Sequence, residues 1–238
     1  MGFYKVTLNN YGASRVCVYN SGCNFNCLGC AYKLVGRDRD SSGCLNYGDI
    51  IEKLMAIRPD RVHFLGGEPT TNSQLTDLAE FAHENLGATT KIGHSNGSGR
   101  IPDCIDEASI SIKAYDDNLH KFYTGTSNVT VLENFRDAFE RGITLHASTV
   151  LIPGLIETGE IAKISSFIAN IDPAIPLHIT GYIPVPSLPW RAPTDRELLD
   201  AVRASRSYLQ SVNYNLLNSE EFSKVKVESP IFRSQRLL

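Results

Sequence analysis

The chain alternates short, β-branched apolar runs with stretches of helical periodicity, and this alternation limits the folds open to it. Such alternation is typical of βα units around a parallel sheet. The expected strands are 15–19, 61–65, 89–94, 108–112, 144–152 and 176–182, and the expected helices are 47–57, 74–85, 131–141, 156–170 and 195–211. These units predict the α/β class, and specifically a partial (β/α)6 TIM-like barrel with parallel strands that stays open along one side.

Length and composition fit one folded unit. The 238 residues are 42% hydrophobic, which is enough for one sizeable core. We expect a single domain over residues 1–238, with its core at about 15–210 and a charged tail at about 215–238.

Charge and hydropathy argue against two classes of partner. The formal net charge of −3 gives no basic footprint for nucleic acid. No apolar run approaches the ~20 residues that cross a bilayer, so we expect no membrane partner. The chain opens without an apolar signal segment, which favours a cytoplasmic location where thiols stay reduced.

Three of the six cysteines lie in one short loop after the first expected strand. Cys23, Cys27 and Cys30 are separated by three and two residues. Electron-transfer clusters usually take four cysteines, whereas three in one loop leave one iron free to bind a small chelating molecule. The spacing therefore predicts a [4Fe–4S] cluster with a site for chemistry.

Three other roles for these cysteines stay open at this point. A structural zinc ion would need a fourth ligand, which Cys44 or His63 can supply, although zinc ligands more often come as two separated pairs. A redox pair formed by Cys27 and Cys30 would leave Cys23 without a role. A disulfide framework is typical of oxidising compartments and not of the location expected here.

Polar or glycine-rich segments follow the later expected strands. Gly66-Gly67-Glu68-Pro69 follows the second strand, Ser95-Asn96-Gly97 the third, Lys113 the fourth and Ile152-Pro153-Gly154 the fifth. In parallel α/β folds the carboxyl ends of the strands carry the active site, so we expect these segments to share a rim with the cysteine loop. Two glycines let the backbone approach a ligand closely, and Glu68 offers a carboxylate to a cationic amine.

Together these motifs resemble the radical S-adenosylmethionine (SAM) superfamily. The Cys-x3-Cys-x2-Cys loop and the Gly-Gly-Glu-Pro sequence are that family's best markers. The order Ser-Asn-Gly, Ser-Ile-Lys, His120, Thr124-Gly125 and Ile-Pro-Gly further resembles the activating enzymes of glycyl-radical proteins, including pyruvate formate-lyase activase. The resemblance covers about residues 15–210.

The resemblance implies two cofactors and a reaction. SAM would chelate the open iron, while Cys23, Cys27 and Cys30 ligate the other three. Reduction of the cluster would split SAM into methionine and a 5′-deoxyadenosyl radical that abstracts hydrogen from the substrate. The residues implied to bind SAM are Gly66, Gly67, Glu68, Asn96, Ser111, Lys113 and Ser148. Lys113 would pair with the methionyl carboxylate.

The resemblance and the open barrel imply a protein substrate. An opening along one side suits a macromolecule more than a small molecule that needs full enclosure. We expect a glycyl-radical enzyme as substrate and an electron donor such as flavodoxin or ferredoxin. The alternatives are a radical SAM enzyme acting on a small molecule or a peptide, and an iron–sulfur or zinc binding module without turnover.

The chain departs from the family pattern at His94, Ser111 and Gly29, and also at Ser148, which stands where a positively charged partner for SAM is expected. The activating enzymes carry Asp where His94 and Ser111 stand, so this chain either lacks a cation beside SAM or replaces its charge with a protonated His94. Gly29 stands where the superfamily often has an aromatic residue, and Tyr32 is the expected substitute. No residue is assigned as a catalyst, because His94, His146 and His178 lie in expected strands, where a hydrogen-bonded core histidine is common.

Overall fold

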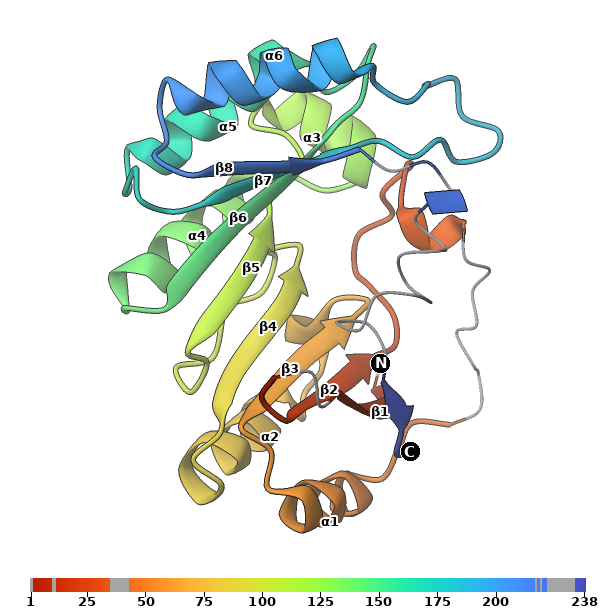
Figure 1. Cartoon of the computed structure of the whole chain (residues 1–238), viewed down its shortest axis with the longest axis vertical. Helices are drawn as coiled ribbons and strands as arrows, with labels where there is room; N and C mark the ends of the chain where they lie inside the picture. The colour runs from red at the N-terminus through yellow and green to blue at the C-terminus, as the bar shows by residue number, and fades with distance from the viewer. Residues whose placement is uncertain (1, 10–11, 35–42, 217, 219, 222–233) are drawn as a thin grey trace.

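The described part of the chain folds into one sheet with helices on its outer face (Figure 1). This computed structural model describes residues 2–9, 12–34, 43–216, 218, 220–221 and 234–238. The strands are β1 (Phe3–Asn9), β2 (Arg15–Asn20), β3 (Arg61–Gly66), β4 (Thr89–Ser95), β5 (Glu107–Ser111), β6 (Thr144–Leu151), β7 (Leu177–Gly181), β8 (Val212–Asn215) and β9 (Gln235–Arg236).

The sheet is open and mostly parallel. Its order is β8-β7-β6-β5-β4-β3-β2-β1-β9, with parallel pairing from β2 to β8. β1 pairs antiparallel with β2, and β9 pairs antiparallel with β1. The predicted α/β class and partial barrel are therefore confirmed, and all six predicted strands are present. The prediction missed β1, β8 and β9; β8 has one buried residue, Val212, so its apolar signal is weak.

Helices connect most of the parallel strands. They are α1 (Tyr47–Ile57), α2 (Leu75–Glu80), α3 (Asp117–Thr124), α4 (Val129–Glu140), α5 (Thr158–Ala169) and α6 (Asp195–Arg206), with shorter turns η1 (Ala31–Lys33), η2 (Pro69–Thr71) and η3 (Phe81–Asn85). The helix expected at 74–85 is α2 followed by a π-helical turn, η3. The eight-residue helix α3 was not predicted. No helix in the described residues is long and apolar enough to cross a membrane.

Burial alternates along the strands and places the core between the sheet and the helices. Phe64, Ile92 and Ile110 are fully buried on the outer face, in the same core cluster as helix residues such as Phe135 and Ile164. Burying one such side chain contributes about 1.5–3 kcal/mol. Because the core lies outside the sheet, its inner face is left for the functional site. Most of the expected tail at 215–238 lies outside the described residues, although β9 within it joins the sheet edge.

The loops after β2 and β3 continue side by side beyond the strands. The amide of Gly67 donates to the carbonyl of Asn20 at 2.9 Å, and the amide of Glu68 donates to the carbonyl of Gly22 at 2.8 Å. A Cβ placed on Gly67 would lie 1.6 Å from the carbonyl oxygen of Gly22. Only glycine therefore lets the cysteine loop approach the Gly-Gly-Glu-Pro loop this closely.

We expect Gly67→Ala to destabilise the fold by at least about 3 kcal/mol, because the clash is with backbone and cannot be relieved by one side chain. Gly159 in α5 is the matched control, since no atom lies within 4 Å of a Cβ placed there. Gly159→Ala should be neutral or stabilising by up to about 1 kcal/mol. Urea unfolding of both variants checks this. Equal stability of the two would contradict the close approach.

Candidate functional site

A cavity of about 640 Å³ lies at the carboxyl ends of the strands and continues along the inner face of the sheet. It brings together most of the residues that the sequence singles out. Nine of them line it: Cys23, Cys27, Cys30, Gly66, Gly67, Asn96, Ser111, Lys113 and Ser148. Glu68 does not line the cavity and is fully buried behind it. The structure therefore brings into one cavity motifs that are far apart in the chain.

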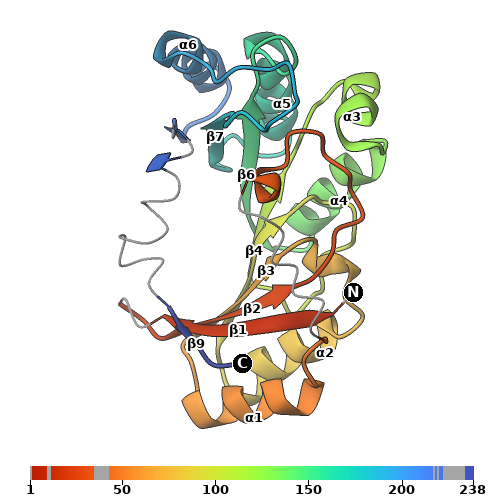
Figure 2. The same ribbon diagram turned by 90° about the vertical axis from the view of Figure 1, so that its right-hand side faces the viewer.

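The cysteine loop is held by the end of α3. After β2 the chain runs toward α3, as Figure 2 shows. The amide of Asn26 donates to the carbonyl of Thr124, and the amide of Leu28 donates to that of Tyr123, both at 2.9 Å. The Phe25 ring meets the His120 ring edge-on, with centroids 5.6 Å apart. Two backbone bonds and one ring contact thus fix the loop between its first and third cysteines.

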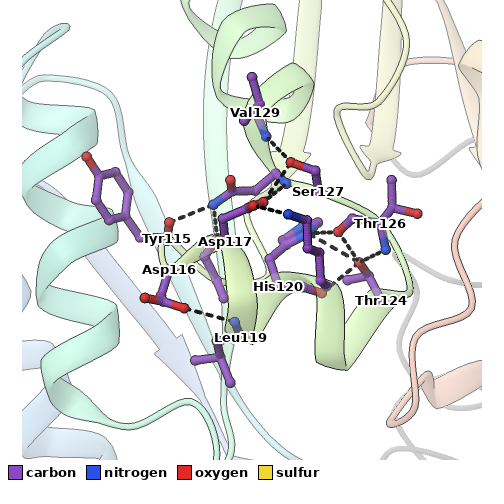
Figure 3. Close-up of polar contacts among 12 residues, drawn as sticks. Tyr115, Asp116, Asp117, Leu119, His120, Thr124, Thr126, Ser127 and Val129 are labelled. Carbon is purple, nitrogen blue, oxygen red and sulfur yellow. Dashed lines mark hydrogen bonds and ion pairs between the residues drawn. The ribbon is translucent and has the colours of Figure 1, made fainter.

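A hydrogen-bond network ties both ends of α3 to the residues that follow it (Figure 3). The Nδ1 of His120 donates to the carbonyl of Thr126 at 2.6 Å, and the hydroxyl of Thr124 lies 3.0 Å from the same carbonyl. Asp117 accepts from the Ser127 hydroxyl at 2.7 Å. Lys121 and Ser127 lower the pKa of Asp117, so the carboxylate stays ionised. His120 and Thr124-Gly125, which the sequence comparison singled out, therefore belong to the network that supports the cysteine loop.

The Cys23 sulfur receives two hydrogen bonds. The amide of Phe25 donates at 3.4 Å and the Nδ2 of Asn96 donates at 3.6 Å. Burial raises the pKa of Cys23 and of Cys27, while the nearby Lys113 ammonium opposes the rise at Cys27. Metal ligation by these thiols therefore releases protons, and the donors and the ammonium stabilise the resulting thiolates.

Glu68 ties the Gly-Gly-Glu-Pro loop to the loop after β4. Its carboxylate accepts from the amide and hydroxyl of Thr70 at 3.1 and 2.7 Å. It also accepts from the hydroxyl of Ser95 at 2.9 Å and from the amide of Asn96 at 2.5 Å. With four donors and no exposed surface, this carboxylate faces the protein interior. Its evident role is to place Asn96 beside Cys23.

Lys113 and His94 face the cavity from adjacent strands. The Lys113 ammonium donates to the Ser111 hydroxyl at 2.6 Å. The pKa of His94 is lowered, first by its partial removal from water and then by Lys113 and His178. His94 is therefore neutral near pH 7. The lowered pKa argues against the protonated His94 that the sequence left open.

Two tyrosines fill the space beside Gly29. A Cβ placed on Gly29 would lie 2.7 Å from a ring carbon of Tyr182 and 2.9 Å from the hydroxyl oxygen of Tyr123. Trp190 meets both tyrosine rings edge-on. An aromatic side chain cannot fit at position 29, and Tyr123 and Tyr182 supply the rings there. Tyr32, the expected substitute, lines the cavity but is 49% exposed.

Among the described residues, neither of the two fourth ligands considered for zinc lies with the three cysteines. Cys44 and His63 do not line the cavity that the three cysteines share. Among the described residues, no three His, Cys, Asp or Glu side chains form a group that could hold a single metal ion. The three thiols do share one cavity wall, with hydrogen-bond donors and a cation close by. This donor set fits thiolate ligation of an iron–sulfur cluster, which is larger than one ion.

Comparison with known proteins identifies the family. The radical SAM superfamily matches residues 18–167, more than half of the chain, so the chain belongs to this superfamily. A Methanocaldococcus jannaschii protein named "Putative glycyl-radical enzyme activating enzyme" is 29% identical over 221 residues, which cover 86% of this chain and 82% of that relative. The protein is thus a radical SAM enzyme with an activating-enzyme-like relative.

Solved structures show the same fold. A domain of pyruvate-formate lyase-activating enzyme from Bacteroides vulgatus has a TM-score of 0.55 and 17% identity, over 65% of this chain and 98% of that chain. SuiB from Streptococcus suis, with SAM bound, has a TM-score of 0.64 and 18% identity, over 84% of this chain and 49% of that chain. Enzymes of this superfamily use a [4Fe–4S] cluster and SAM, which are the cofactors of this chain.

We expect Asn96 to set the reduction potential of the cluster, because hydrogen bonds to the ligand sulfurs favour the reduced state. Asn96→Ala should shift the midpoint potential to a more negative value, and Asn96→Asp further still, because it adds a negative charge. Gln210→Ala, an exposed position outside the cavity, is the control. Redox titration of the reconstituted proteins, monitored by electron paramagnetic resonance, measures the midpoint potential of each variant. Unchanged potentials in both Asn96 variants at full iron content would contradict this role.

Proposed function

We propose that this radical SAM enzyme activates a glycyl-radical protein by abstracting a hydrogen atom from a glycine Cα. One observation carries the proposal: three half-exposed cysteines, on a single loop, share a cavity that extends along the inner face of an open sheet. The open side gives a loop of another protein a route to the cavity. The name of the Methanocaldococcus relative supports the same class of substrate.

In this proposal Cys23, Cys27 and Cys30 hold the [4Fe–4S] cluster and leave one iron to SAM. When bound and reduced, the cluster supplies the electron that splits SAM into methionine and a 5′-deoxyadenosyl radical. An electron donor such as flavodoxin or ferredoxin would deliver that electron in the cytoplasm. The cysteine loop is only partly buried, so a docked donor can approach it.

The residues around the cysteines would bind and orient SAM. Gly66 and Gly67 let the backbone lie close to the methionyl group. Lys113, already oriented by Ser111, would hold the methionyl carboxylate. Ser148 would add a hydroxyl from β6. Glu68 would position these loops without contacting SAM, because its carboxylate is hydrogen-bonded to Thr70, Ser95 and Asn96.

The substrate would complete the site from the open side. Hydrogen abstraction needs the glycine Cα close to the 5′ carbon in a near-attack arrangement. Tyr123 and Tyr182, both buried beside Gly29, would exclude water from that end of the cavity. Glycine has no side chain, so its Cα can come closer to the radical than that of any other residue.

Deuterium transfer tests this function. A cell extract of the source organism grown on glycine deuterated at Cα is separated by size, and each fraction is added to reduced, SAM-loaded enzyme. We expect 5′-deoxyadenosine one mass unit heavier with the macromolecular fraction only. Cys27→Ser should form none, because the cluster loses a ligand.

Deuterated product with the small-molecule fraction alone would contradict a protein substrate. It would favour the alternative, a radical SAM enzyme acting on a small molecule.

A further inference from the structure

The inner face of β5, β6 and β7 carries polar side chains that line the cavity and have no role in the site described above. Ser109, His146, His178 and Thr180 form what we term the inner polar patch, and all four line the cavity. Ser109 lies opposite His146 in the sheet register, one row below the paired Ser111 and Ser148. The interior of a closed barrel is normally filled by branched apolar residues. Here that space is open, and these polar groups lie among the apolar atoms that form most of its wall.

These four side chains have no hydrogen-bond or ion-pair partner in the described part of the chain. Their neighbours differ in this respect: Ser111 accepts from Lys113, and Asn96 donates to Asn24 and Cys23. Polar groups that leave water are almost always paired in native proteins. Four half-buried groups that face a cavity without internal partners are therefore available to a ligand.

The cavity around the patch carries little charge. No Asp or Glu lies among the described residues that line it, and its lysines, Lys33 and Lys113, belong to the cysteine end. Burial lowers the pKa of His146 and Lys91 lowers it further, while Glu107 opposes this; the net direction is down, so the ring is neutral near pH 7. A neutral imidazole offers one donor and one acceptor. The patch therefore suits an uncharged ligand with both kinds of group.

We propose that the inner polar patch binds uncharged amide groups of the peptide backbone that flanks the reacting glycine. This inference rests on the proposed function and names how the substrate is recognised. Each peptide unit carries one N–H and one C=O, which must find partners when a segment leaves water. Adjacent strands lie about 4.8 Å apart, so a peptide crossing from β5 to β7 passes a patch residue on each of the three strands.

Histidine resonances give the most direct test. Holoenzyme with an oxidised cluster and ¹⁵N-labelled imidazoles is titrated with N-acetyl-triglycine amide, a neutral peptide. We expect saturable shifts at His146 and His178. His83 is the internal control, because it lies outside the cavity and faces Asp106. The His146→Phe/His178→Phe double variant should bind the peptide at least about tenfold more weakly.

Two further probes separate the ligand classes. Sorbitol presents hydroxyl groups without amides, and glutarate presents charge. Shifts of His146 and His178 with the peptide alone support the inference. Equal or larger shifts with sorbitol or glutarate, or no shifts with the peptide, would overturn it. The titration needs no SAM cleavage, so its failure is distinct from failure of deuterium transfer.

Discussion

One buried carboxylate connects the loops on which the site depends. Glu68 accepts four hydrogen bonds from the loops after β3 and β4, and its backbone amide is bonded to the cysteine loop. Leaving any of these donors unpaired in the interior would cost about 1–3 kcal/mol. The three loops are therefore positioned as one unit. Asn96 extends this unit to Cys23, the first of the three cysteines.

One face of the sheet forms the hydrophobic core, and the other face lines the functional site. Apolar side chains point outward under the helices, where Phe64 and Ile110 are fully buried. Polar side chains point inward, where a cavity of about 640 Å³ runs from the cysteine loop to His146 and His178. An open barrel can keep such an unfilled cavity, with polar groups on its wall, because its core is already formed on the other face. In the proposed function, the same opening would give a protein substrate access to the site.

The sequence predicts the fold and the position of the site better than the roles of individual side chains. Strands with strong apolar periodicity are found because burial sets their pattern, whereas β8 and α3 are short and give little signal. Spacing predicts that the three cysteines act together, but it cannot show that Glu68 faces the interior. Nor can it show that Tyr123 and Tyr182 fill the space beside Gly29, because that contact joins segments brought together only by folding.

The central claim is that the three cysteines hold a cluster that cleaves SAM. The most direct measurement is 5′-deoxyadenosine formed by anaerobically reconstituted, dithionite-reduced protein with SAM, for the native chain and for Cys27→Ala. The account predicts product with the native chain and none with the variant. Equal amounts of product from both, or none from native protein with an intact reduced cluster, would contradict it.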